Sequence, residues 1–198
     1  MITIIDYGLG NIGSVVNTCE RLDLPCTVSA DPLVVGSAAS LLLPGVGAAG
    51  TGMKNLKERG LDTVIRKQIA NGVPFLGFCL GMQLLFDYSE EADTVCLGII
   101  PGNVVKFRAE KKVPQIGWNT VRVNEKNPKA IRLFDGIDSC EFYFVNSYYP
   151  VPRDSEVIAA TTQYGETFAS AVTYKNVFAT QFHPEKSGTR GKQLLTNF

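Results

Sequence analysis

The first half of the chain alternates between short apolar runs and longer amphipathic stretches, with turn residues between them. Strands and helices in alternation argue for a parallel β-sheet with helices on both faces. The apolar runs predict strands over Ile2–Asp6, Pro25–Ser29, Ser40–Leu43 and Val73–Phe78. The stretches with helical spacing predict helices over Asn11–Leu22, Met53–Ala70 and Leu80–Tyr88.

The second half contains mostly strand-like segments joined by turn signals. Strands are expected over Asn103–Phe107, Gln115–Val123, Glu141–Tyr149, Val157–Tyr164, Thr167–Tyr174 and Val177–Phe182, and helices over Pro128–Phe134 and Gly188–Phe198. No repeat, low-complexity segment or linker divides the chain. The prediction is one α/β domain over residues 1–198. Its central mixed, mostly parallel sheet is flanked by helices and gains antiparallel strands in the second half.

The composition fits a globular protein with free thiols. Apolar residues make up 45% of the 198 residues, enough for a packed core. Lys plus Arg and Asp plus Glu both total 19, so no basic excess exists for nucleic acid. Five widely spaced Cys and one His argue against a zinc site. With no signal peptide and no membrane-spanning run, we expect a cytoplasmic protein.

A glycine-rich turn follows the first predicted strand and opens a helix. Residues 8–13 fit the G-x-G-x-x-G pattern of dinucleotide sites, and Asp31 lies at about the right distance for a ribose contact. The alternative is a plain strand–helix turn in which glycine permits close backbone approach. Asp31 precedes a proline in what reads as a loop, so the plain turn is the favoured interpretation.

A second turn places a cysteine between two glycines. Residues 77–81 read Gly-Phe-Cys-Leu-Gly, between a predicted strand and a predicted helix. This is the spacing of a nucleophile elbow, with Cys79 as the nucleophile and the Leu80 N–H as an oxyanion donor. A helix N-terminus also favours the thiolate. The alternative, a buried structural cysteine, is assigned to the other four cysteines.

The one histidine of the chain, His183, follows an apolar run and precedes Pro184 and Glu185. In an extended segment, residues two apart point the same way, so Glu185 can reach the imidazole and fix its tautomer. A cysteine nucleophile needs such a base. Cys79, His183 and Glu185 are therefore the predicted catalytic triad.

A third glycine-rich turn, Pro44-Gly45-Val46-Gly47, ends another predicted strand. Its N–H groups, at Gly45, Val46 and Gly47, are candidates for the second oxyanion donor. The alternative is a plain β–α turn. If activation requires a backbone flip at Val46, a β-branched residue makes that flip costly without help.

These segments resemble the class I (triad) glutamine amidotransferases, and most closely the glutaminase subunits of imidazole glycerol phosphate synthase. The matches run from residue 3 to the last helix. They are residues 6–11 (DYGLGN), 44–47 (PGVG), 79–83 (CLGMQ), 117–119 (GWN), 144–148 (FVNSY) and 181–187 (QFHPEKS). The resemblance implies a flavodoxin-like α/β fold and the hydrolysis of L-glutamine to L-glutamate and ammonia, with no cofactor and no metal.

The resemblance also implies residue roles. Cys79 attacks the side-chain amide, His183 moves protons and Glu185 orients His183. Gln83, Glu91, Ser147 and Tyr148 match positions that hold the bound glutamine. From the sequence alone, a solvated residue at a helix end is the favoured interpretation of Glu91, and the alternative for Tyr143–Tyr149 is an ordinary strand with aromatic packing.

The resemblance also implies a partner protein. The glutaminase docks on a (β/α)8-barrel synthase as a heterodimer and passes it ammonia. The interface positions carried over are Asn11, Trp118, Tyr143 and Lys186, although Trp118 by residue type could equally be a core residue. The alternatives are a related glutaminase serving another amination enzyme, a cysteine hydrolase of another amide, a dinucleotide-binding module and a non-catalytic scaffold.

Overall fold

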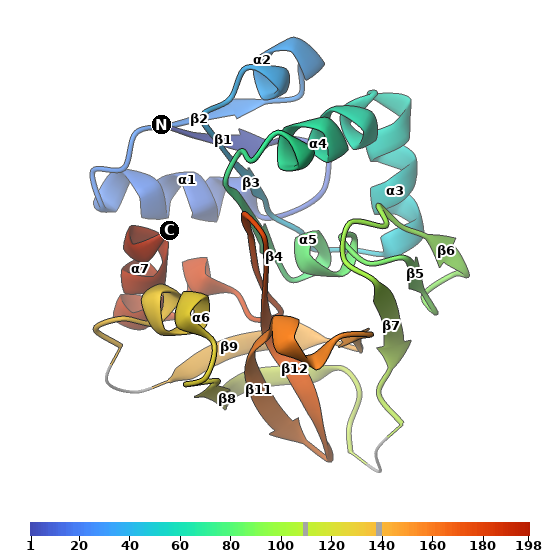
Figure 1. Ribbon diagram of the computed structural model, residues 1–198, viewed down its shortest axis with the longest axis vertical. Helices are drawn as coiled ribbons and strands as arrows, with labels where there is room; N and C mark the ends of the chain where they lie inside the picture. The colour runs from blue at the N-terminus through green and yellow to red at the C-terminus, as the bar shows by residue number, and fades with distance from the viewer. Residues whose placement is uncertain (109–110, 138–139) are drawn as a thin grey trace.

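A large twisted sheet forms the centre of the molecule. The computed structural model describes residues 1–108, 111–137 and 140–198, and in these residues the sheet has nine strands in the order β2-β1-β3-β4-β13-β12-β11-β8-β9 (Figure 1). The first five are parallel: β2 (Cys26–Ser29), β1 (Ile2–Ile5), β3 (Ser40–Leu43), β4 (Phe75–Phe78) and β13 (Val177–Thr180). Their carboxyl ends therefore meet at one edge.

The rest of the sheet is antiparallel. It consists of β12 (Glu166–Tyr174), β11 (Ile158–Tyr164), β8 (Gln115–Val123) and β9 (Glu141–Asn146). The 3-10 turn η1 (Ser155–Val157) leads into β11. The predicted fold class, a mixed sheet with antiparallel strands from the second half, is confirmed.

Helices cover both faces of the parallel part (Figure 1). On one face, α1 (Ile12–Arg21) and α7 (Gly188–Asn197) pack on the strands through Val15, Cys19 and Leu195. The other face carries α2 (Pro32–Gly36), α3 (Ala49–Glu58) and α4 (Leu61–Ala70), which pack through Val35, Leu56 and Ile65. This arrangement buries the strands on both sides, which explains their continuous apolar sequences.

A smaller sheet, in the order β10-β7-β5-β6, packs into the same core as α3 and α4. Its strands are β10 (Tyr148–Pro152), β7 (Gly102–Lys106), β5 (Tyr88–Ser89) and β6 (Thr94–Val95). Helix α6 (Pro128–Leu133) packs against the antiparallel part and closes an aromatic core, in which the Phe142 and Phe182 rings stack with centroids 4.1 Å apart.

Three predicted elements are wrong in extent. The helix expected over Met53–Ala70 is two helices, because Gly60 adopts a left-handed conformation (φ +67°) and ends the first one. The helix expected over Leu80–Tyr88 is only α5 (Leu80–Gln83). The carbonyls of residues 84–86 instead accept hydrogen bonds from the N–H groups of residues 97–99, at 2.7–2.9 Å.

The strand expected over Glu141–Tyr149 is also two strands. It divides at Ser147, so that β9 joins the large sheet and β10 the smaller one. The short helix α2 and the β5–β6 pair were not predicted. Both breaks, after Gln83 and at Ser147, lie beside the cavity described below.

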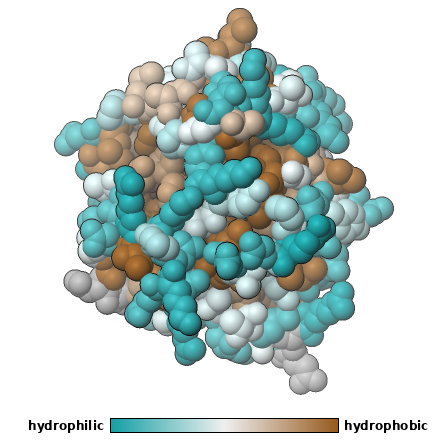
Figure 2. All heavy atoms as spheres, in the orientation of Figure 1, coloured by the Kyte–Doolittle hydropathy of each residue, from teal (hydrophilic) through white to brown (hydrophobic). Residues whose placement is uncertain are grey.

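The outer surface shows no single large apolar face in the view of Figure 2, where hydrophobic and hydrophilic side chains are interspersed. Within the described part of the chain, no helix is both long and apolar enough to cross a membrane.

Candidate active site

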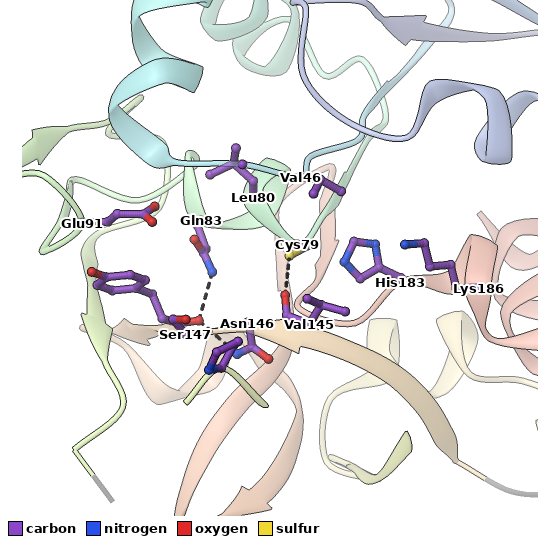
Figure 3. A pocket seen from close by; sticks show the side chains of 13 residues that line it. Val46, Cys79, Leu80, Gln83, Glu91, Val145, Asn146, Ser147, His183 and Lys186 are labelled. Atoms are coloured by element: carbon purple, nitrogen blue, oxygen red, sulfur yellow. Dashed lines mark hydrogen bonds between the residues drawn. The ribbon is translucent and has the colours of Figure 1, made fainter. Parts of the chain in front are cut away.

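A cavity of about 250 Å³ opens where the parallel strands β3, β4 and β13 end. Each strand contributes the residues that follow it: Val46 after β3, Cys79 and Leu80 after β4, and His183 and Lys186 after β13. The carboxyl edge of a parallel sheet is the usual ligand site in open α/β folds. Figure 3 shows Val46, Cys79, His183 and Lys186 around a common space, with Gln83, Glu91 and Ser147 on its far side, whereas the Leu80 side chain turns into the core.

Cys79 occupies the sharp turn between β4 and α5. Its φ of +49° is unusual for a residue with a side chain, and its N–H donates to Thr180 O at 2.7 Å. The flanking glycines make the turn possible: a Cβ on Gly81 would come within 2.0 Å of Leu43 O, and one on Gly77 within 2.9 Å of Gly81 O. The elbow geometry expected from the sequence is present.

Cys79 is 7% exposed, and its thiol has two polar neighbours. It donates to Val145 O at 3.6 Å and accepts from Gln181 Nε2 at 3.5 Å (Figure 3 shows the first contact). Because α5 has only four residues, its dipole is small. The helix dipole at Cys79 is thus weaker than the predicted helix Leu80–Tyr88 would give, and the prediction that the helix N-terminus favours the thiolate stays a prediction.

His183 lies beside Cys79 and is held from behind by Glu185. Glu185 Oε1 lies 2.8 Å from His183 Nδ1, and the two side chains are 2% and 3% exposed. Burial alone would lower the pKa of His183, but hydrogen bonding to Cys79 and Glu185 and their charges raise it from 6.5 to about 10. His183 is thus buried next to two groups that favour its protonated form.

The backbone around His183 is also fixed. The His183 N–H donates to Tyr143 O at 2.9 Å, and the Ser187 hydroxyl donates to His183 O at 2.6 Å. Ser187 Oγ in turn accepts from the Tyr143 N–H at 3.0 Å. The turn η2 (Pro184–Lys186) is thereby tied to the start of β9, which leaves the imidazole little freedom.

The Pro44–Gly47 turn packs directly on the elbow. A Cβ on Gly45 would lie 2.6 Å from Gly81 N, so only glycine fits there. Tyr7 is fully buried, and its hydroxyl donates to Pro44 O at 2.9 Å. Burial, followed by the nearby Cys79, raises the pKa of Tyr7 well above its usual value, so the hydroxyl keeps its proton.

The predicted oxyanion donors lie on two sides of Cys79. Val46 and Gly47 line the cavity, and Gly47 has φ +130°. The Leu80 N–H is at the first position of α5 and so has no acceptor within that helix. Gly45 is the member of this group that is packed away against the elbow.

The residues expected to hold glutamine form the opposite wall of the cavity. Gln83, Glu91, Ser147 and Tyr148 all line it. Gln83 Nε2 donates to Tyr148 O at 3.0 Å, and Glu91 Oε2 accepts from the Ala49 N–H at 2.7 Å. Glu91 lies in the turn between β5 and β6, so it is not the solvated residue at a helix end that the sequence also allowed.

Three of the four positions assigned to a partner interface lie together. Trp118 is 53% exposed, which excludes the core position, and packs edge-on against Tyr143 with centroids 6.1 Å apart. Lys186 Nζ lies 6.0 Å from the centre of the Tyr143 ring. Asn11 is the N-cap of α1, where its side chain accepts from the Ser14 N–H at 3.3 Å.

The glycine-rich turn at residues 8–13 does not have the features of a dinucleotide site. The third glycine of that pattern serves close helix–strand packing, yet a Cβ on Gly13 would meet nothing within 4 Å. Asp31 is the N-cap of α2 and accepts from the Leu33 N–H at 2.8 Å. The plain turn explains both observations.

Gln181 and Tyr7, which contact Cys79 and Pro44 beside the cavity, were not assigned a role from the sequence. Gln181 belongs to the same short motif as His183, and Tyr7 precedes the first glycine-rich turn. The signal that the sequence offered for a role was that each lies within or next to a motif already singled out. Among the described residues, no group of three or more His, Cys, Asp or Glu side chains is arranged to hold a metal ion.

A family model described as glutamine amidotransferase class-I matches residues 3–198. The chain belongs to the class-I glutamine amidotransferases. The family resemblance predicted from the sequence is thus confirmed.

Curated relatives of this glutamine amidotransferase match it over its full length. A protein of Moorella thermoacetica is 48% identical over 199 residues, covering 100% of this chain and 93% of its own. A protein of Dehalococcoides mccartyi is 46% identical over 200 residues, which cover 100% of this chain and 96% of that protein. Each is named imidazole glycerol phosphate synthase subunit HisH.

Solved structures share the fold at lower identity. The structure of PurLQS from Thermotoga maritima has a TM-score of 0.77 and 18% identity, over 99% of this chain and 95% of that one. A crystal structure of glutamine amidotransferase has a TM-score of 0.75 and 20% identity, over 99% and 96%. These two structures support the fold alone.

Proposed function

We propose that this chain is the glutaminase subunit of an imidazole glycerol phosphate synthase, and that residues 1–198 form one glutamine amidotransferase domain. It hydrolyses L-glutamine to L-glutamate and ammonia. The observation that carries the proposal is the cavity at the sheet edge, where Cys79 lies beside His183 and His183 is backed by Glu185 at 2.8 Å. The full-length similarity to subunits of that name supports the choice of enzyme.

In the first half of the reaction, Cys79 Sγ attacks the side-chain amide carbon of glutamine. The C–N bond breaks, a thioester forms, and His183 gives the leaving nitrogen the proton that the thiol surrendered, so ammonia departs neutral. Glu185 holds Nδ1 and thereby leaves Nε2 to face the reacting atoms.

In the second half, His183 takes a proton from water as the water attacks the thioester carbon. The C–S bond breaks, glutamate leaves, and the proton returns to Cys79. Both tetrahedral intermediates carry an oxyanion, for which the Leu80 N–H on one side and the N–H groups of Val46 and Gly47 on the other are the donors.

The opposite wall of the cavity holds the rest of the glutamine molecule. Glu91 is the carboxylate for its ammonium group, the backbone at Ser147 and Tyr148 receives its carboxylate, and Gln83 contacts its side chain. Gln83 comes from α5, Glu91 from the turn between β5 and β6, and Ser147 and Tyr148 from the junction of β9 and β10. The site therefore depends on the break after α5 and the break between β9 and β10.

Ammonia released into water would protonate and be lost as a nucleophile, so the site needs a partner that receives it. That partner is the (β/α)8-barrel synthase subunit, in a heterodimer. The cluster of Trp118, Tyr143 and Lys186 is an exposed aromatic and cationic surface close to the mouth of the cavity, and Asn11 completes the contact.

A glutamine-like diazo ketone tests the chemistry independently of any partner. We expect mass spectrometry to find one adduct, on Cys79, and excess glutamine to prevent it. The His183→Ala variant should label much more slowly, and the Cys19→Ala variant at the normal rate. Labelling of another cysteine, or labelling that glutamine does not suppress, would favour a cysteine hydrolase of a different substrate.

A further inference from the structure

Gln181 is a fully buried polar residue that the Cys–His–Glu mechanism does not use. It lies just after β13, two positions before His183, and its side chain reaches across to the elbow. Gln181 Nε2 lies 3.5 Å from Cys79 Sγ, and Gln181 Oε1 lies 3.0 Å from Gln83 Nε2. A buried amide with both ends in contact with active-site residues needs an explanation.

The direction of these hydrogen bonds follows from one backbone carbonyl. Tyr148 O can only accept, so the atom of Gln83 that lies 3.0 Å from it must be the NH₂ group. The same NH₂ group of Gln83 faces Gln181, which must therefore present its oxygen. The NH₂ group of Gln181 is then left to face Cys79. The amide orientation is thus set by hydrogen-bonding requirements.

The nucleophile needs such a donor. Val145 O, 3.6 Å from Cys79 Sγ, suits a thiol but repels a thiolate. The helix that follows Cys79 has only four residues and gives little dipole. The ionisable groups around the thiol are His183 with Glu185 behind it, Tyr7 below, and Glu91 and Lys186 on the cavity wall. Gln181 adds to these ionisable groups a neutral hydrogen-bond donor to the sulfur.

We propose that Gln181 is a further catalytic residue: its NH₂ group donates to the Cys79 thiolate and is aimed there by the Tyr148–Gln83–Gln181 hydrogen-bond chain. As a catalytic role, this rests on the proposed glutaminase function. Donation by a fixed dipole stabilises the ionised sulfur without adding a charge, and it remains when His183 gives up its proton. The chain also links a residue of the glutamine-binding wall to the nucleophile.

The test measures the thiol directly and needs no glutamine. The rate of Cys79 alkylation by iodoacetamide is followed by peptide mass spectrometry across pH in the full chain. We expect the midpoint to rise by about one unit in Gln181→Met, the scale of one hydrogen bond to a charged group, with an about tenfold slower reaction below the midpoint. Gln181→Glu keeps the shape but, as a carboxylate, replaces the donor with a negatively charged acceptor, so it should raise the midpoint by more than Gln181→Met does.

Gln68→Met is the matched control, because Gln68 is also buried and donates through Nε2 to a backbone carbonyl, Gly36 O, far from the cavity. It should lose stability in thermal unfolding but keep the Cys79 midpoint. Gln83→Met should raise the midpoint partially, and adding it to Gln181→Met should have no further effect. An unchanged midpoint in both Gln181 variants, or an equal shift in Gln68→Met, would overturn the proposal.

Glutamine turnover in complex with the synthase subunit separates this proposal from the function on which it rests. The Gln181→Met loss of kcat/KM should be largest at low pH and recover above the shifted midpoint, whereas a merely structural defect would be the same at every pH. Absence of turnover in the unsubstituted complex would reject the glutaminase function. The alkylation midpoints would still decide whether Gln181 donates to Cys79.

Discussion

The contact between Glu185 and His183 gives a prediction whose size follows from the structure. The two atoms are 2.8 Å apart, and neither side chain is more than 3% exposed, so water cannot replace the carboxylate. A hydrogen bond to a charged group contributes about 1.5–3 kcal/mol. Glu185→Gln should therefore lower the pKa of His183 by about one to two units from its raised value.

The same substitution affects turnover through the tautomer of His183. Glu185 Oε2 has no hydrogen-bond partner among the described residues, so nothing there fixes the orientation of a substituted amide. The amide can present either oxygen or NH₂ to Nδ1, and only the first keeps the productive tautomer. We expect kcat to fall by about 10²–10³-fold, less than the roughly 10⁴-fold known for a fully wrong tautomer.

The effect on stability has a definite sign with pH. The pKa of His183 is raised from 6.5 to about 10 in the folded protein, so its stabilisation is complete below 6.5 and is lost as pH rises through about 10. The deficit of Glu185→Gln in the free energy of unfolding should therefore be largest near pH 6 and shrink above pH 10. Urea unfolding at several pH values measures it.

The exposed carboxylate Glu58 provides the control. It lies 3.8 Å from Lys54, one turn earlier on the exposed face of α3. Glu58→Gln should therefore change the free energy of unfolding by less than about 0.5 kcal/mol at any pH. Equal deficits of Glu185→Gln at pH 6 and above pH 10, together with normal turnover, would refute the reasoning about His183.

Three further substitutions test the turn and the partner surface. Val46→Gly should raise glutamine turnover of the isolated chain about fivefold, because glycine removes about 1 kcal/mol of strain from a backbone flip; an unchanged basal rate would exclude that flip. Tyr7→Phe leaves Pro44 O without its donor and should cost about 1–2 kcal/mol in urea unfolding, whereas no loss would mean that the carbonyl finds another partner. Trp118→Ala should weaken synthase binding at least about tenfold in calorimetry with little change in melting temperature, because the ring is 53% exposed; unaltered affinity would place the interface elsewhere.

The sequence predicts the fold well where local pattern and tertiary structure agree. The strand Gln115–Val123 has the predicted bounds, and the parallel order follows from alternating strands and helices. The break at Gly60 was missed because apolar spacing continues through Leu56, Leu61 and Ile65 on both sides of it. The break at Ser147 was missed because it is set by pairing with two different sheets, which a local pattern does not contain.

The candidate site was predictable to a similar degree. Cys79 stands out by its flanking glycines, and His183 by being the one histidine, with Glu185 two residues on. The part played by Gln181 depends on an amide contact across 102 positions, and that of Tyr7 on a carbonyl 37 positions away. Neither contact leaves a periodic trace in the sequence, so only the folded arrangement reveals them.

Glutamate release from L-glutamine by the purified chain tests the central claim most directly. It is measured with and without a (β/α)8-barrel imidazole glycerol phosphate synthase subunit carrying its nucleotide ligand. The account predicts slow release by the chain alone, strong stimulation by the loaded barrel, and loss of both in Cys79→Ala. Release that ignores the barrel would move the search to another acceptor enzyme, and release that survives in Cys79→Ala would contradict the mechanism.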